Sequence, residues 1–260
     1  MAIVKSDFQM NGCLGNFSMY QRNGKTIMRQ KGGGSKEKIK TAKSCAPIRE
    51  SNSEFATVST IGMRLRRAIG NHLKQYSDAS MIGNLVGCLK KLIAKGTGDP
   101  GERTLDASTA PEILTGFEFN KLVPFDSCFK SGISVEVSKV HQSAVWQASL
   151  CPASDICFPE EATSFALIHT LLCFPRFEKQ ANSKQYLPVY PSASFFAATE
   201  MSERYFAKLD LRIKVNLSVQ LDSSYVQADA SLLCIVGIAF YKDGQGMKGV
   251  NAMKIVKVVG

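Results

Sequence analysis

The chain has 260 residues, of which 45% are hydrophobic and 21% charged. This composition is typical of a globular protein and excludes a small fold that needs disulfide or metal staples. The formal net charge is +10, and the whole excess lies in residues 1–110, which hold 18 Lys and Arg against 8 Asp and Glu. Such asymmetry suggests an acidic partner for the first part of the chain: nucleic acid, an acidic protein surface or membrane head groups. A basic surface with no specific partner is the simpler alternative.

No run of 18 or more apolar residues is present, so we expect no membrane span. The opening MAIVKSDFQMNG lacks the apolar core of a signal peptide, and we therefore expect a cytoplasmic protein. The eight cysteines are scattered without a CxxC pair or a paired Cys/His spacing. We expect them to be mostly buried thiols in a reducing compartment, with no metal site and no cofactor.

Residues 1–53 are predicted to form a β-hairpin followed by a basic arm. The strands LGNFSMYQ and TIMRQK flank Asn23-Gly24, the dipeptide that favours a type I′ hairpin turn. An isolated hairpin is marginally stable in water, so it must pack on the body of the chain or on another copy. Residues 32–53 hold little that could build a core, and we interpret them as an extended basic arm or linker.

The basic residues of this region are the candidate contacts to a polyanion or a partner protein. They are Arg29, Lys31, Lys36, Lys38, Lys40, Lys43 and Arg49, together with Arg64, Arg66 and Arg67 from the segment that follows. No aromatic residue lies between Gln21 and Phe55, so a nucleic acid would be contacted through its backbone, without sequence preference. The glycine triplet 32–34 could form an anion-binding nest, although a solvated arm is the simpler interpretation. Gly24-Lys25-Thr26 matches only the end of a phosphate-binding loop, because Met19 stands where that motif needs glycine.

Two helices are expected at residues 54–70 and 79–95, with Ser51-Asn52-Ser53 offering N-caps for the first. The breaker-rich segment 96–112 is the predicted domain boundary, which gives a hairpin and arm at 1–53 and a helical region with its linker at 54–112. Residues 113–260 are then the third region.

The third region is predicted to be an antiparallel β-sandwich. Residues 209–221 alternate apolar and polar side chains, which is typical of a strand with one buried face, and residues 131–140 show the same pattern. Residues 231–241 form a more deeply buried strand, and segments 144–150, 164–174 and 250–259 bring the number to six or seven. The fold class is therefore α+β and mainly β.

Residues 174–196 are rich in aromatic and proline residues. Phe174, Phe177, Tyr186 and Tyr190, with Phe195 and Phe196 beyond them, form either a loop folded over the sandwich or an interface patch. The sequence leaves both alternatives open.

Nothing in the sequence forms a catalytic set, and we expect no catalytic residue. The chain has three histidines, His72, His141 and His169, and no GxSxG, HExxH or DxDxDG motif. Glu160 and Glu161 are adjacent, and neighbours on a strand point to opposite faces.

The string LGNFSMYQRNGKTIMRQKGGGSKEKIKT, with RESNSEFATVSTIGMRLRRAI after it, resembles the opening of an uncharacterised family of proteins from Bacteroidota. The shared pattern is G-x-x-S-x-Y, then GK, then R-x-KGG-x-SKEKIKT and R-x-N-x-x-EF, followed by a basic helix and a phrase like Gly116-Phe117-Glu118-Phe119-Asn120. The resemblance is clearest over residues 12–70. It implies no activity and no catalytic residues.

The leading hypothesis is a non-enzymatic structural or interaction protein that forms a homomeric assembly through its basic N-terminal arm. The alternative is a sequence-independent nucleic-acid-binding protein that uses the same basic residues. A small-molecule binder or enzyme at the rim of the sandwich is the third possibility.

Overall fold

The computed structural model describes residues 2–4, 10–22, 24–32, 34–140, 142–180, 185–190, 193–224 and 226–260. The chain divides into two compact units, Met1–Arg49 and Glu50–Gly260, which are called the N-terminal unit and the main unit. No helix among the described residues is long and apolar enough to cross a membrane.

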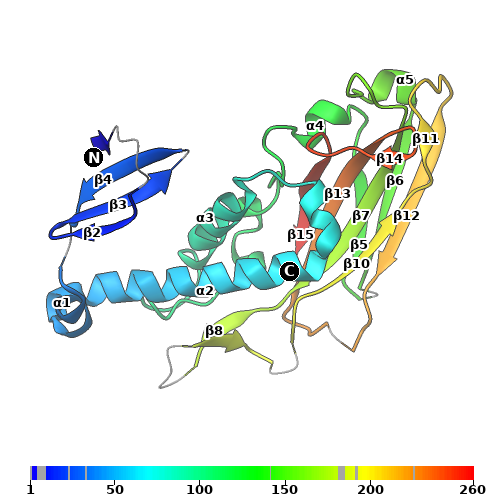
Figure 1. The fold of residues 1–260 in the computed structure, drawn as a ribbon. Coiled ribbons are helices and arrows are strands. Elements are labelled where there is room, and N and C mark those ends of the chain that lie inside the picture. Colours follow the sequence, from blue (N-terminus) through cyan, green and yellow to red (C-terminus); the bar gives the residue numbers. More distant parts are fainter. Residues whose placement is uncertain are drawn as a thin grey trace. The chain divides into compact units, whose positions relative to one another are not determined.

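The N-terminal unit contains a four-stranded antiparallel sheet in the order β1-β4-β3-β2 (Figure 1). Its strands are β1 Ala2–Val4, β2 Gly12–Leu14, β3 Phe17–Arg22 and β4 Lys25–Gln30. Strands β3 and β4 pair from Arg22 with Lys25 to Phe17 with Gln30, so the predicted hairpin is confirmed. Gly24 has a φ of 72°, a conformation that favours glycine. Asn23, the other residue of the predicted type I′ turn, lies outside the described residues.

The predicted extended arm is wrong, because most of residues 35–53 are helical. Helix α1 spans Lys36–Thr41, the short 3-10 helix η1 spans Lys43–Cys45, and helix α2 begins directly after it. The Ser35 side chain accepts a hydrogen bond from the Lys38 N–H and so caps α1, as serine does at helix N-termini. The Arg49 side chain ties the two helices together by donating to the carbonyl oxygens of Ile39 and Ala42 at 2.8 and 2.9 Å.

Helix α2 spans Ala46–Ile69 and α3 spans Met81–Ile93, which confirms both predicted helices with different bounds. The first begins eight residues earlier than predicted, with Pro47 in its first turn, where proline has no hydrogen bond to lose. Residues 51–53 are therefore inside the helix and do not cap it. The shorter helices are η2 Asn71–Gln75, η3 Ala107–Thr109, η4 Pro111–Ile113, α4 Phe125–Cys128 and α5 Pro152–Asp155.

The main unit contains two larger antiparallel sheets and a small hairpin. The six-stranded sheet has the order β10-β7-β13-β14, with β15 also paired to β13 and β11 to β7, and the three-stranded sheet has the order β12-β6-β5. The strands are β5 Ser134–Ser138, β6 Ser143–Leu150, β7 Ser164–Phe174, β10 Phe196–Met201, β11 Tyr205–Phe206, β12 Ile213–Gln220, β13 Ser231–Lys242, β14 Gln245–Gly246 and β15 Ala252–Val259. The hairpin joins β8 Phe177–Lys179 to β9 Tyr186–Pro188.

The two larger sheets pack face to face, so the predicted sandwich is confirmed. Trp146 and Leu217 of the three-stranded sheet lie in one buried cluster with Leu167 and Ile238 of the six-stranded sheet. β12 is buried at every second residue because its other side chains face solvent.

A third layer covers the second face of the six-stranded sheet. There Leu65 of α2 and Leu85 of α3 share a buried cluster with Ile235 and Met253 of the sheet. β7 is buried at all its positions because both its faces are covered. The sequence placed the two helices in a region of their own, 54–112, whereas they share a core with the sheet and belong to the same unit.

Candidate interaction site

One face of the N-terminal sheet carries a group of apolar side chains, two of which are exposed. Side chains alternate along a strand, and the register pairs Leu14 with Phe17 and Met19 with Met28, so these four side chains lie on one face. Leu14 is 69% exposed and Phe17 41% exposed, while Met19 and Met28 are half-buried. We call these four residues the apolar sheet face. An exposed apolar group of this kind is a candidate contact surface.

The opposite face of the same sheet carries basic side chains together with Ile3 and Ile27. Tyr20 lies on it, and the register places Arg22, Lys25 and Arg29 on that side as well. All three cations are exposed, and the Arg29 guanidinium lies 6.0 Å from the centroid of the Tyr20 ring, within cation–π range. We call these four residues the basic sheet face. The pattern offers positive charge beside one aromatic ring.

The N-terminal unit has very little core of its own. Among those residues of the unit whose side chains the structure describes, only Thr26, Ile27 and Cys45 are buried. A sheet gains independent stability from a buried apolar face, and here Leu14 and Phe17 of that face are exposed. The sheet therefore has surface to bury against a partner.

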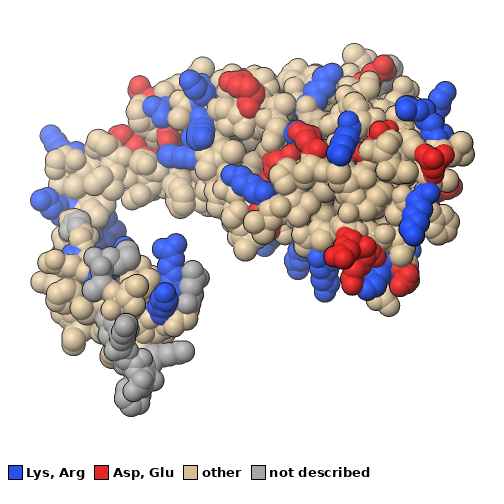
Figure 2. Space-filling model, turned by 90° about the horizontal axis from the view of Figure 1, so that it is seen from above, with Lys and Arg blue, Asp and Glu red and all other residues tan. Residues whose placement is uncertain are grey.

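The lysines of α1 and η1 add to the positive charge. Lys36, Lys38, Lys40 and Lys43 are exposed, and no acidic side chain pairs with them in the part of the chain that the structure describes. Residues 1–49 hold ten Lys and Arg against two Asp and Glu, whereas residues 50–260 hold 22 against 20. Figure 2 shows the two signs interspersed over the main unit. The positive charge is thus a property of the N-terminal unit.

Two of the predicted contact residues have structural hydrogen bonds instead of a free head group. Arg49 donates to carbonyl groups of its own unit, as described above, and Lys31 Nζ donates to the Gly15 carbonyl at 3.1 Å. The glycine nest is not described as a whole, because Gly33 lies outside the described residues.

The three arginines near the end of α2, Arg64, Arg66 and Arg67, divide into two kinds. Arg66 Nε donates to the Gly62 carbonyl on its own helix at 3.1 Å. Arg64 and Arg67 line a cleft of about 380 Å³ together with Phe177, which the sequence had assigned to a different surface. The structure therefore brings two sets of predicted residues to one place, although they are far apart in the sequence.

The aromatic stretch is mostly core, and this corrects its interpretation as an interface patch. Phe174, Phe177 and Tyr186 are buried in the cluster beneath α2 and α3, and burial raises the pKa of Tyr186 to about 12. Tyr190 is exposed, as are its neighbours Leu187 and Val189. Phe177 lies in the core where β8 pairs with Leu105, and Phe174 lies there as the last residue of the buried strand β7. Pro191 lies outside the described residues.

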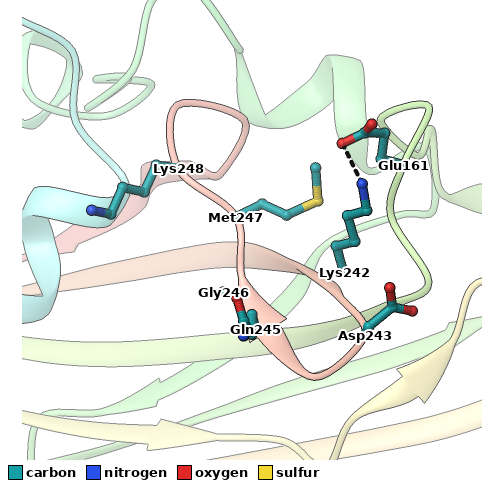
Figure 3. A pocket seen from close by; sticks show the side chains of 7 residues that line it. All are labelled: Glu161, Lys242, Asp243, Gln245, Gly246, Met247 and Lys248. Carbon is teal, nitrogen blue, oxygen red and sulfur yellow. Dashed lines mark ion pairs between the residues drawn. The ribbon is translucent and has the colours of Figure 1, made fainter.

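A shallow pocket of about 530 Å³ lies at the rim of the sandwich, beside the turn between β13 and β14 (Figure 3). Asp243 and Gly244 form this turn with φ values of 48° and 82°. Lys242 Nζ lies 3.0 Å from a Glu161 carboxylate oxygen, and Figure 3 shows Lys248 pointing away from this pair. The lysine at the centre of the pocket is therefore already neutralised.

His169 is a core residue of the sandwich. It is completely buried on β7, its Nδ1 lies 3.1 Å from the Leu217 carbonyl oxygen, and its Nε2 has no hydrogen-bond partner among the described residues. Burial lowers the pKa of His169, and it lowers that of His72 as well. His141 lies outside the described residues. Within the described ranges, no three His, Cys, Asp or Glu side chains gather as a metal site would need.

Comparisons of the chain with protein-family models, with curated proteins and with solved structures find no match. The geometry of the chain itself is therefore the basis for a functional proposal.

Proposed function

We propose that this chain is a non-enzymatic interaction protein that forms a homomeric assembly through its N-terminal unit. The observation that carries the proposal is the apolar sheet face, whose Leu14 and Phe17 are exposed on a sheet with few buried side chains among those described. Two such faces are self-complementary under a two-fold axis, and sheets pack face to face about 10 Å apart. This arrangement turns the basic sheet faces outward, so the positive charges of the two copies are kept apart.

The strength of the contact follows from Leu14 and Phe17. Complete burial of such a side chain contributes about 1.5–3 kcal/mol. Scaled by the exposed fractions of 69% and 41%, the two residues contribute about 2 kcal/mol per copy. A two-fold contact contains both residues from each copy, so the total is about 4 kcal/mol. This free energy corresponds to about a thousandfold change in the dissociation constant.

The test is the molar mass of the full-length protein, measured by size-exclusion chromatography with light scattering over a dilution series. We expect a multiple of 28.4 kDa for the unmodified chain and a monomer for the double variant Leu14→Thr, Phe17→Thr. Threonine keeps the strand propensity while it removes the apolar surface. The matched control is Leu122→Thr, since Leu122 is 84% exposed on the main unit. A double variant with an unchanged mass, or a control with a reduced mass, refutes the apolar sheet face as the contact.

The second candidate function is sequence-independent nucleic-acid binding through the basic sheet face and the lysines of α1 and η1. The specific observation in its favour is Tyr20, because an aromatic ring among cations gives a base a surface on which to stack. Nucleic-acid affinity falls steeply with salt, whereas apolar assembly of two like-charged units persists or strengthens. The sign of the salt dependence therefore separates the two functions.

A further inference from the structure

The cleft beside α2 has the size of a small-molecule site. It has a volume of about 380 Å³, and ligand pockets span roughly 300–1,000 Å³. The lining residues are Arg64, Arg67 and Ala68 of α2, Phe177 of β8, Pro188 of β9, and Ala193, Ser194 and Phe195 of the segment that leads to β10. The α2 and β8 residues of this lining are far apart in the sequence, and Figure 1 shows β8 below α2 in this view. We call this cleft the arginine cleft.

The floor of the arginine cleft is aromatic and held in place. Phe177 is 1% exposed, and its backbone N–H and carbonyl are both hydrogen-bonded to Leu105 at 2.9 Å. The Phe195 ring stacks on Phe177 with centroids 5.7 Å apart and an angle of 25° between the planes. Phe174 meets Phe195 edge to face at 5.1 Å, which fixes the second ring. The floor is therefore formed before any ligand arrives.

The rim of the arginine cleft carries two free cations. Arg64 and Arg67 are three residues apart on α2, so their side chains lie on one face of the helix. Both are exposed, and no carboxylate of the described residues pairs with either of them. The rim pocket at the β13–β14 turn differs in this respect, because Glu161 neutralises Lys242, one of its two lysines.

We propose that the arginine cleft binds a small organic anion, with a single carboxylate or phosphate group on a flat apolar body. Guanidinium groups bind carboxylate and phosphate through paired hydrogen bonds, and two of them side by side hold one anionic group between them. The apolar body of the ligand then lies against Phe195 and Pro188. This site belongs to the main unit and does not depend on the assembly of the N-terminal unit.

The test is isothermal titration of the full-length protein at constant ionic strength with four probes. Phenyl phosphate and 3-phenylpropionate carry both parts of the ligand, inorganic phosphate lacks the apolar body, and benzyl alcohol lacks the charge. We expect one or both of the first two probes to bind, with the other two weaker by about tenfold or more. The ratio between phenyl phosphate and 3-phenylpropionate identifies the anionic group. Failure of both to bind, or equal binding of inorganic phosphate, overturns the proposal.

Matched variants of α2 locate the binding. The double variant Arg64→Gln, Arg67→Gln should weaken the better probe by about tenfold or more, because it removes both charge-assisted contacts. Arg66→Gln should leave the affinity unchanged, since Arg66 bonds to its own helix and does not line the cleft. Equal losses in the double variant and in Arg66→Gln would mean that the net charge of the helix, and not the cleft, attracts the anion, and would refute the site.

Discussion

Glu54 is the buried carboxylate that holds α2 to its neighbours, and its replacement by alanine should destabilise the main unit. Its Oε2 lies 2.7 Å from Lys90 Nζ on α3, and its Oε1 accepts a hydrogen bond from the Gly101 N–H at 2.9 Å. Arg103 Nη1 lies 3.6 Å from the same oxygen. Burial raises the pKa of Glu54, but the hydrogen bonds from Lys90 and Gly101 outweigh that effect and hold the pKa below 4.5.

The expected loss follows from what the alanine variant leaves behind. Breaking a fully buried pair costs about 3–5 kcal/mol. The Lys90 and Arg103 side chains are 32% and 27% exposed, so water solvates them again and the cost falls. The Gly101 N–H loses its acceptor, and an unsatisfied buried donor costs about 1–3 kcal/mol. We therefore expect Glu54→Ala to lower the free energy of unfolding by about 2–3 kcal/mol.

The assay is urea unfolding followed by the fluorescence of Trp146, the single tryptophan, which is buried between the two sheets. Glu50→Gln, one turn earlier on α2, is the control and should lie within about 0.5 kcal/mol of the unmodified chain. A folded pKa below the unfolded one means that the unfolded chain binds more protons, so the contribution of Glu54 is present above pH 4.5 and is lost below it. A Glu54→Ala loss below about 0.5 kcal/mol, or one that does not shrink under acid, would refute this account.

Two further predictions concern the sandwich and its helical cover. Burial lowers the pKa of His169, so the stability of the folded chain should fall as the pH drops below about 6.5. The variant His169→Asn keeps a donor for the Leu217 carbonyl, and its urea unfolding midpoint should depend less on pH in that range. An unchanged acid slope in this variant would contradict the assignment. Gly237→Ala should cost about 1–3 kcal/mol, because the added Cβ would lie 2.6 Å from Ile168 Cγ2. In Gly87→Ala on α3 the added Cβ meets nothing within 4 Å, and this variant should stabilise the fold by about 1 kcal/mol. Thermal midpoints that shift in the same direction for Gly237→Ala and Gly87→Ala would contradict the packing around Gly237.

The strands could be predicted where their environment leaves a local signal. β12 has one face in solvent, so its sequence alternates and its existence is plain from the residues alone. β7 and β13 are continuous apolar runs because a helical layer and a second sheet cover them. The periodicity of α2 and α3 identifies their buried faces but does not say what they pack on. The third layer of the main unit could therefore not be predicted from the sequence alone.

The sequence predicted the charged residues of the candidate sites but not how these residues are arranged in space. α1 has no buried residue, so its lysine-rich sequence has no apolar period from which a helix could be predicted, and its main local signal is the Ser35 cap. The arginine cleft joins Arg64 and Arg67 to Phe177 through the pairing of β8 with Leu105, a long-range contact without a local sequence signal. The apolar sheet face could be recognised only from the register of β2 on β3, which places Leu14 beside Phe17.

The two candidate functions of the N-terminal unit use opposite faces of one sheet, and a single contact cannot cover both. If two copies associate through Leu14 and Phe17, the register turns Arg22, Lys25 and Arg29 away from the contact, where they remain open to a polyanion. Association then doubles the number of basic faces in one particle, which raises the affinity for a long polyanion by linked binding. Apolar contacts survive added salt, while each phosphate contact is weakened by it. An assembly that keeps its mass in high salt but releases nucleic acid would therefore place both functions on this one sheet.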